Sequence, residues 1–355
     1  MMAGGTTAEN MRRTDLAAMA GAAAAAFFFG ISTPLSKTLA GGMNAFALAG
    51  LLYLGAGIGL ALLEPFKKRE PAPSAGKLNY KYILGMVLFG GLLGPVFLML
   101  AIGLAPAASI SIWLNIELAA TALLGHFLFK DHLNRLGWAS VALTLVAGVM
   151  LSWGSGAAGF RAGVLVALAC FAWGLDNHFT ALIDGLSPSR STIIKGLTAG
   201  TTNLLIGMAL AGGLPPLQAS GKAMLTGFFC YGLSITLYIS SAQKLGAVRS
   251  QLIFSVAPVF GVLLSVLSLG ESLSTVQMVS GTLLFASVWI MLAERHRHHH
   301  AHSEMEHAHQ HSHDDLHHGH PHAENPAGPH SHFHRHEKTG HDHPHWPDLH
   351  HRHGH

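Results

Sequence analysis

The chain has 355 residues, of which 50% are hydrophobic and only 11% are charged, and its mean hydropathy is +0.38. A soluble domain usually carries about 25% charged residues, so the composition argues against a soluble enzyme or a nucleic-acid-binding protein. The charges that give the net +3 sit mostly in short clusters. Between the clusters lie apolar stretches of about 18 to 25 residues, which is the length that crosses a bilayer as a helix. The sequence therefore predicts a multi-pass protein surrounded by membrane lipid.

Ten such stretches follow one another along the chain. They are predicted as membrane spans at 15–38, 43–63, 80–101, 104–128, 136–153, 161–183, 191–212, 221–242, 247–269 and 273–293. The first stretch is longer than the apolar core of a signal peptide and is not followed by a persuasive cleavage site. The predicted fold class is an all-α membrane protein with ten transmembrane helices.

The distribution of Lys and Arg predicts the orientation, because cytoplasmic loops of membrane proteins are enriched in both. With the N-terminus in the cytoplasm, the outer segments hold only Lys37, Arg161 and Lys222. Fifteen cations fall on the cytoplasmic side, namely Arg12, Arg13, Lys67, Lys68, Arg69, Lys77, Lys81, Lys130, Arg135, Arg190, Lys195, Lys244, Arg249, Arg295 and Arg297. This bias predicts an inner (plasma) membrane protein with both termini in the cytoplasm.

The two halves of the chain share short patterns. An aromatic residue followed by Gly, an aliphatic residue and polar residues occurs at 28–34 and again at 172–178, and the junction 129–133 resembles 269–273. Since each half contains five spans, the second half must be inserted upside down relative to the first. Inverted repeats are a common plan of secondary transporters, whose substrate site lies near the midplane between the halves.

These paired motifs, together with the Gly270-Glu271 junction and Gln277 and Gly281 in the last span, resemble the EamA repeats of the drug/metabolite transporter superfamily. The first half departs from the pattern because Lys130-Asp131 replaces Gly-Glu. The resemblance implies ten helices around a central cavity and the export of small molecules. It divides the chain into a cytoplasmic segment (1–14), a first repeat (15–153), a linker (154–160), a second repeat (161–294) and a tail (295–355).

Polar groups at bilayer depth are functional candidates because lipid does not solvate them. Glu117 and Asn115 lie in the fourth predicted span, and Asp176, Asn177 and His178 lie in the sixth. Carboxylate oxygens and imidazole nitrogens suit a late divalent transition metal, and a carboxylate can equally carry a coupling proton. The alternatives are structural: His178 or Asp176 caps a broken helix, Glu117 pairs with a neighbouring amide, and the asparagines form helix–helix hydrogen bonds.

The last sixty residues, from His296, contain 24 of the 27 histidines. This segment has few aliphatic residues and is interrupted by Pro and Gly, so it is predicted to be disordered without metal. Short His-rich tracts bind Ni, Co and Zn. The predicted tail ligands are His298, His300, His309, His311, His313, His318, His320, His343 and His345.

The leading hypothesis is a secondary exporter of divalent transition metals, nickel or cobalt first and zinc next, with protons as the coupling ion. One alternative is a metabolite or amino-acid exporter whose tail only buffers or senses metal. Another is a membrane-tethered metal store. The sequence contains no nucleotide-binding loop, no nucleophile motif and no His-Glu-x-x-His zinc site, so it predicts neither an enzyme nor an ATP-driven pump, and it requires no cofactor. Dimerisation is left open.

Overall fold

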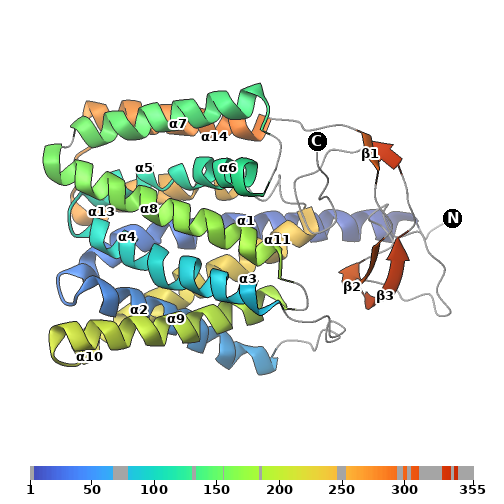
Figure 1. The fold of residues 1–355 in the computed structure, drawn as a ribbon, viewed down its shortest axis with the longest axis horizontal. Coiled ribbons are helices and arrows are strands. Elements are labelled where there is room, and N and C mark those ends of the chain that lie inside the picture. Colours follow the sequence, from blue (N-terminus) through green and yellow to red (C-terminus); the bar gives the residue numbers. More distant parts are fainter. Residues whose placement is uncertain are drawn as a thin grey trace.

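The computed structural model describes residues 4–66, 79–129, 133–154, 156–183, 186–245, 253–293, 299–301, 305–311, 330–336 and 340–342. Within these ranges the chain forms a bundle of helices that run roughly along one common direction (Figure 1). Short strands lie at the end of the bundle where the first helix begins.

The helices of the first half are α1 (Gly4–Ala40), α2 (Ala45–Leu63), α3 (Tyr80–Gly85), α4 (Gly94–Ile102), α5 (Ala107–Trp113), α6 (Ile116–Leu128) and α7 (Arg135–Gly154). The helices of the second half are α8 (Gly156–Ala181), α9 (Pro188–Ala211), α10 (Leu217–Gly227), α11 (Ser234–Leu245), α13 (Ala257–Leu269) and α14 (Thr275–Ala293). A short 3₁₀ turn, η1 (Glu64–Phe66), follows α2. Helix α1 begins within the predicted segment 1–14, and α8 begins within the predicted linker 154–160.

Eight helical stretches of the described residues are long and apolar enough to cross a membrane, and α13 and α14 are shorter apolar helices. Several of the long stretches combine consecutive elements. Tyr80–Ile102 contains α3 and α4, Ala107–Leu128 contains α5 and α6, and Leu217–Ser241 contains α10 and most of α11. The prediction of an all-helical, multi-pass membrane fold with about ten helices is confirmed.

Helix irregularities occur at matching places in the two halves. The third span contains a π-helical segment, η2 (Met86–Leu93), and the eighth contains another, η3 (Phe228–Leu233). The fourth span is interrupted at residues 114–115, and the helix of the ninth is interrupted at residues 255–256. π-helical turns and broken helices often mark functional positions in membrane helices, so these four points locate the region of the bundle where a substrate path would pass.

Helices α2 and α9 pack backbone to backbone. A Cβ atom added at Gly50 would lie 2.4 Å from the backbone nitrogen of Leu204, and one added at Gly200 would lie 2.6 Å from that of Leu54. Small residues allow this close approach, which stabilises helix pairs in membranes by van der Waals packing. The glycine contacts join the second span of one half to the second span of the other.

Four short strands lie in the tail: β1 (His299–Ala301), β2 (Met305–His311), β3 (His330–His336) and β4 (Gly340–Asp342). They form two antiparallel pairs, β1 with β4 and β2 with β3. The composition did not predict this pairing. The histidines recur at every second residue of β2 and β3, which is the period of a strand. Of the predicted ligands, three lie in these strands (His300, His309 and His311), and the rest lie outside the described residues, namely His298, His313, His318, His320, His343 and His345.

Candidate transport site

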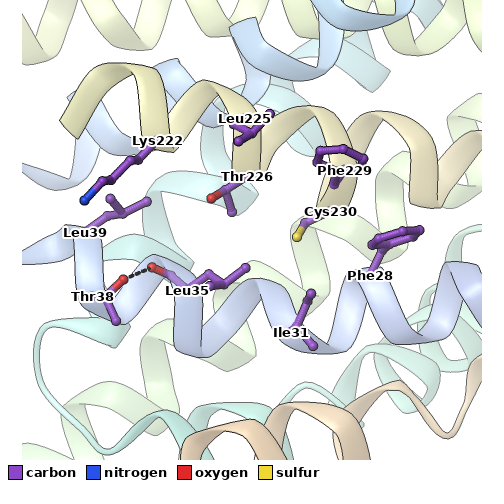
Figure 2. A pocket seen from close by; sticks show the side chains of 10 residues that line it. All are labelled: Phe28, Ile31, Leu35, Thr38, Leu39, Lys222, Leu225, Thr226, Phe229 and Cys230. Atoms are coloured by element: carbon purple, nitrogen blue, oxygen red, sulfur yellow. Dashed lines mark hydrogen bonds between the residues drawn. The ribbon is translucent and has the colours of Figure 1, made fainter. Parts of the chain in front are cut away.

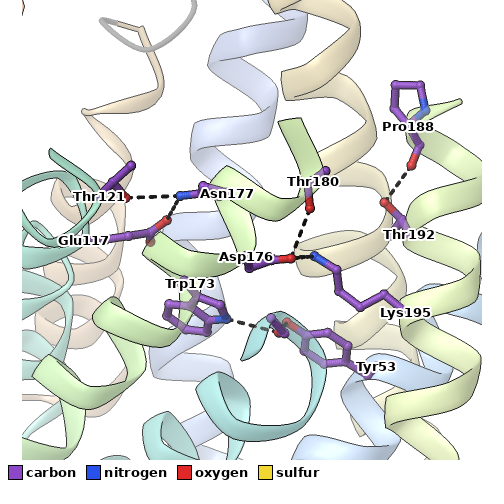
Figure 3. A network of polar contacts seen from close by, with 11 residues as sticks. Tyr53, Glu117, Thr121, Trp173, Asp176, Asn177, Thr180, Pro188, Thr192 and Lys195 are labelled. Carbon is purple, nitrogen blue, oxygen red and sulfur yellow. Dashed lines mark hydrogen bonds and ion pairs between the residues drawn. The ribbon is translucent and has the colours of Figure 1, made fainter. Parts of the chain in front are cut away.

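A buried ion pair joins α8 to α9. The Lys195 Nζ lies 2.7 Å from Oδ1 and 2.5 Å from Oδ2 of Asp176 (Figure 3). The hydroxyl of Thr180, one turn further along α8, donates to Oδ1 of Asp176 at 3.1 Å. Both ionic side chains are about nine-tenths buried, with 11% and 10% of their surface exposed. The Asp176 carboxylate is therefore neutralised inside the protein and is not open to a substrate cation in this conformation.

The π-helical segment η2 makes the room for this pair. A Cβ atom added at Gly90 would lie 2.2 Å from the Asp176 carboxylate, so only glycine fits here. The Gly90 carbonyl also accepts hydrogen bonds from the Tyr53 hydroxyl at 2.7 Å and from the Trp173 indole at 3.3 Å. Since the backbone of η2 is accessible to side chains from α2 and α8, the irregular turn connects three helices around the ion pair.

A second polar contact joins α6 to the opposite side of α8. The Asn177 amide donates to Oε1 of Glu117 at 3.1 Å and to the Thr121 hydroxyl at 3.4 Å (Figure 3). Glu117 is half-buried and Asn177 is exposed, although both lie within membrane-spanning helices. No hydrogen bond or ion pair found among the described residues gives the Glu117 carboxylate a cationic partner. Of the two predicted carboxylates, Glu117 is therefore the one that remains open to a cation.

The other two predicted site residues are held by local contacts. His178 Nε2 lies 3.0 Å from the Thr121 carbonyl oxygen, and its ring stacks on Phe129 at a centroid distance of 4.3 Å. Asn115 lies at the interruption between α5 and α6, where its amide donates to the Ile112 carbonyl at 3.0 Å. Both side chains thus meet backbone carbonyl groups: His178 contacts α6 across the helix interface, and Asn115 bonds within its own span.

The predicted residues come together in two contacts rather than one ligand set. Glu117 and Asn177 meet on one side of α8, and Asp176 meets Lys195 on the other. The two carboxylates interact electrostatically with each other and with Lys195. Among the residues described by the structure, no group of three or more His, Cys, Asp or Glu side chains is placed to hold a metal ion. The arrangement offers one partly accessible carboxyl group, that of Glu117, beside a closed ion pair.

A separate groove lies between α1 and the α10–η3 helix. Its volume is about 410 Å³, and it is lined by Phe28, Ile31, Leu35, Thr38, Leu39, Lys222, Leu225, Thr226, Phe229 and Cys230 (Figure 2). Phe28 and Phe229 stack with their centroids 5.7 Å apart near one end, and Lys222 lies near the other. None of the five predicted cavity residues lines this groove. Its apolar walls would suit the apolar part of an organic molecule, and the Lys222 ammonium would suit an anionic group on that molecule.

The junction between α13 and α14 holds the start of α5. Gly270 ends α13 in a left-handed conformation (φ 67°), which glycine adopts readily. The next residue, Glu271, accepts hydrogen bonds from the backbone nitrogens of Ala107 and Ala108, each at 2.8 Å. Helix α5 has no side-chain cap of its own, so a carboxylate from the second half caps a helix of the first. The corresponding Lys130-Asp131 pair lies outside the described residues.

A cation holds the other side of the same turn. Lys37 donates from Nζ to the carbonyl oxygens of Ile102, the last residue of α4, at 2.6 Å and of Ala105, just past its end, at 2.9 Å. The two charges attract each other and complement the adjacent helix ends, positive at a C-terminus and negative at an N-terminus. The turn between the third and fourth spans is thus fixed by α1 and by the α13–α14 junction.

Replacing Glu271 by alanine is expected to destabilise the bundle by about 1.5–3 kcal/mol, because two backbone donors lose hydrogen bonds to a charged acceptor. The check is the thermal midpoint of the purified protein in detergent. Glu64→Ala is the comparison variant, since Glu64 accepts one side-chain hydrogen bond from Ser189 at 3.1 Å and faces Arg190 at 3.6 Å in a partly exposed pair, and such pairs contribute little. Equal midpoints for the two variants would contradict the capping role.

Lys195 is the main site residue that sequence reasoning missed. It was counted among the cytoplasmic cations, whereas the structure buries it inside α9. Ser187 caps the start of α9 and Pro188 occupies its first turn. This Ser-Pro start signal places Lys195 seven residues inside the helix, about two turns in. A cation at that depth requires a partner. The Ser187-Pro188 start of the helix therefore indicated a buried Lys195, but the predicted span began at residue 191, three residues after the helix starts.

The fold and the site define the class of protein as a multi-pass helical membrane transporter. A model of the EamA-like transporter family matches residues 16–153 and 161–293, and the protein belongs to this family. An uncharacterized transporter of Methanothermobacter thermautotrophicus is 26% identical over 289 residues, which cover 75% of this chain and 83% of the relative. A solved structure titled "Crystal structure of protein" is similar in fold alone, with 18% identity and a TM-score of 0.53, and the match covers 77% of this chain and 96% of that one.

Proposed function

We propose that this transporter exports divalent transition-metal cations, nickel or cobalt first and zinc next, and that its histidine-rich tail binds the same metals in the cytoplasm. The observation that carries the proposal is the density of histidines after the last membrane helix, 24 in sixty residues, attached to a bundle that holds an accessible carboxylate. Neutral imidazole is a good ligand for these metals. The tail would raise the local concentration of metal at the entrance of the transport path.

Inside the bundle, the proposal assigns the first contact of the cation to Glu117. Rotating the side-chain amide of Asn177 by half a circle would bring its carbonyl oxygen to the cation as a second ligand. The Thr121 hydroxyl lies next to the Asn177 amide. Asp176 would join only after Lys195 has moved away, because the lysine occupies both of its oxygens. Lys195 thus acts as a built-in cation that holds the acidic site closed while no substrate is bound.

The coupling ion in this proposal is the proton. A carboxylate that is alternately exposed to the two sides of a membrane can carry either a proton or a metal cation, and competition between them couples the two fluxes. The pathway would use Glu117 for this exchange, since its side-chain hydrogen-bond donor is the neutral Asn177 amide, whereas Asp176 is held directly by Lys195. Export against a metal gradient would then be driven by proton entry.

The experiment that tests the proposal compares cells with and without the gene for tolerance to and accumulation of Ni²⁺, Co²⁺ and Zn²⁺. Expression is expected to raise tolerance and lower accumulation of at least one of the three. A variant without residues 296–355 is expected to retain part of this effect but to require a higher cytoplasmic metal concentration. The reason is that the tail concentrates metal near the bundle, whereas the helices of the bundle form the transport path. Unchanged accumulation of all three metals would end the proposal.

A second function is supported by the groove between α1 and α10. An apolar groove of about 410 Å³ with one lysine at its edge falls in the usual size range of small-molecule sites. It favours export of an anionic metabolite or amino acid, with the tail as a metal buffer or sensor. Deleting residues 296–355 separates the two functions. A metabolite exporter without its tail would keep its full rate of metabolite transport and would no longer affect metal accumulation, whereas a metal exporter without its tail would still lower it.

A further inference from the structure

A proline within α1 changes the hydrogen bonding of the helix backbone. Pro34 lies inside α1, and proline has no N–H to donate to the carbonyl four residues earlier. That carbonyl belongs to Gly30, so it lacks the donor that any other residue at position 34 would supply. No side chain of the described residues donates to it instead. The Gly30 carbonyl is thus an acceptor that a bound ion or molecule could use.

A comparable carbonyl next to Pro95 has a protein partner. Pro95 lies in the first turn of α4, and the carbonyl four residues before it is that of Gly91. The Asn203 amide of α9 donates to this carbonyl at 3.2 Å. Membrane helices tolerate proline because neighbouring groups satisfy the freed carbonyl in this way. The contrast indicates that the Gly30 carbonyl takes a partner from outside the described helices.

A serine oxygen lies next to the Gly30 carbonyl. A Cβ atom added at Gly261 of α13 would lie 2.4 Å from the Ser111 Oγ and 2.8 Å from the Gly30 carbonyl oxygen. The two oxygens therefore face the same point, where α1, α5 and α13 meet. Ser111 is 1% exposed, and its hydroxyl has no hydrogen-bond partner among the described residues. Buried hydroxyls usually have one, so this oxygen is also available to a ligand.

Thr33 adds a second unpaired hydroxyl. It is also 1% exposed, and it too has no partner within the described part of the chain. It lies three residues after Gly30, which places both on one face of α1. The same face carries Lys37, whose Nζ reaches the Ala105 carbonyl just before α5. This face of α1 therefore runs along α5, and it brings two hydroxyls and one carbonyl into the same buried region.

This group of three oxygens lies apart from Glu117 but on the same span. Ser111 precedes Glu117 by six residues, roughly 9 Å at the helical rise, and the helix is interrupted between them at residues 114–115. Carbonyl groups at irregular points of membrane helices bind the coupling ions of several secondary transporters. All seven residues of α5 are buried, so the three oxygens are enclosed by protein and do not face lipid.

We propose that a sodium ion binds where α1, α5 and α13 meet, with the Gly30 carbonyl and the hydroxyls of Thr33 and Ser111 as its protein ligands. All three are neutral oxygen donors, which suit a hard cation. Calcium and magnesium sites normally include carboxylates, and this group has none. It also has no imidazole or thiolate, the ligands that suit late transition metals. The site goes beyond the proposed function, because it takes a different ion and does not use Glu117.

The first test removes the proline and keeps every proposed side-chain ligand. Pro34→Ala restores an N–H that donates to the Gly30 carbonyl, so the carbonyl is no longer available to an ion. The thermal midpoint of the full chain in detergent is measured as NaCl replaces KCl at constant ionic strength. An ion that binds only the folded protein raises this midpoint, so the parent is expected to gain stability with sodium and Pro34→Ala is not. Pro95→Ala is the matched control and is expected to keep the sodium effect, because its freed carbonyl already has the Asn203 amide.

The second test removes the hydroxyls. Ser111→Ala and Thr33→Val are each expected to raise the sodium concentration needed for half of the effect by at least about tenfold, the lower end of what loss of a supporting group costs a metal site. Ser109→Ala is the matched control on α5, since the Ser109 hydroxyl is buried but already accepts from Gln277 at 2.8 Å.

Equal midpoints of the parent in sodium and potassium would overturn the proposal and indicate that water satisfies these oxygens. A sodium effect that persists unchanged in Pro34→Ala and Ser111→Ala would overturn it as well, because the ion would then bind elsewhere. The measurement contains no nickel, cobalt or zinc. Its failure therefore leaves the proposed metal export untouched, and failure of metal export would not alter the sodium result.

Discussion

Replacing Lys195 by methionine is expected to destabilise the folded bundle by about 3–5 kcal/mol, the usual cost of leaving one charge of a buried ion pair unpaired. The lysine holds both carboxylate oxygens of Asp176, and the pair is about nine-tenths buried. Thr180 is the only other side chain found to donate to this carboxylate in the described structure, so one hydroxyl would remain to stabilise a full charge. The measurement is the thermal midpoint in detergent, supported by the yield of monodisperse protein.

The double variant Asp176→Asn with Lys195→Met is expected to be more stable than the single lysine variant, because removing both charges of a buried pair is often close to neutral. Lys81→Met is the matched control, since Lys81 is exposed at the start of α3. A double variant that is no more stable than Lys195→Met would contradict the assignment of a coupled ion pair. If the stable double variant also loses metal export, the Asp176–Lys195 pair belongs to the transport path as well as to the fold.

Replacing Glu117 by glutamine is expected to abolish metal export while leaving the protein folded. The glutamine keeps the size of the side chain and an oxygen that accepts from Asn177, so the contact between α6 and α8 survives. What is lost is the charge, and a neutral amide neither attracts a divalent cation nor exchanges a proton. The measurement is metal accumulation in cells that express equal amounts of parent and variant protein.

Two further variants make this result interpretable. Glu117→Asp retains the charge and is expected to retain measurable export. Asn177→Ala removes the amide partner without touching the carboxylate and is expected to weaken export less than Glu117→Gln. Full export by the glutamine variant would remove Glu117 from the path. It would also favour the alternative in which the tail alone protects the cell by storing metal.

The spans were predictable because length and hydropathy act over twenty residues at a time, and a bilayer accepts few other solutions. The partners of the polar residues could not be predicted, because a side chain on a helix can contact any of several neighbouring helices. Asp176 was singled out correctly as a group that must be satisfied, yet its partner lies nineteen residues further along the chain on α9. The cap on α5 comes from Glu271, which lies more than 160 residues away in sequence. Such contacts depend on how the two halves pack, which composition does not encode.

The backbone irregularities were only partly predictable. Pro95 and Pro258 lie within the spans, and both stand in the first turn of a helix that follows an irregular segment, as the fixed φ of proline favours. The π-helical turns carry no proline. In η2 the irregular turn coincides with a close approach in the packing, where Gly90 leaves space for the Asp176 carboxylate. A sequence shows the glycine, but not which side chain needs the room.

The central claim is that Glu117 carries a divalent cation across the membrane in exchange for protons. The most direct measurement is the uptake of radiolabelled nickel, cobalt and zinc into vesicles reconstituted with the purified protein lacking residues 296–355, with and without an imposed pH gradient. The account predicts uptake of at least one metal that is accelerated by the gradient and absent for Glu117→Gln. Uptake that ignores both the gradient and the substitution, or no uptake of any of the three metals, would contradict it.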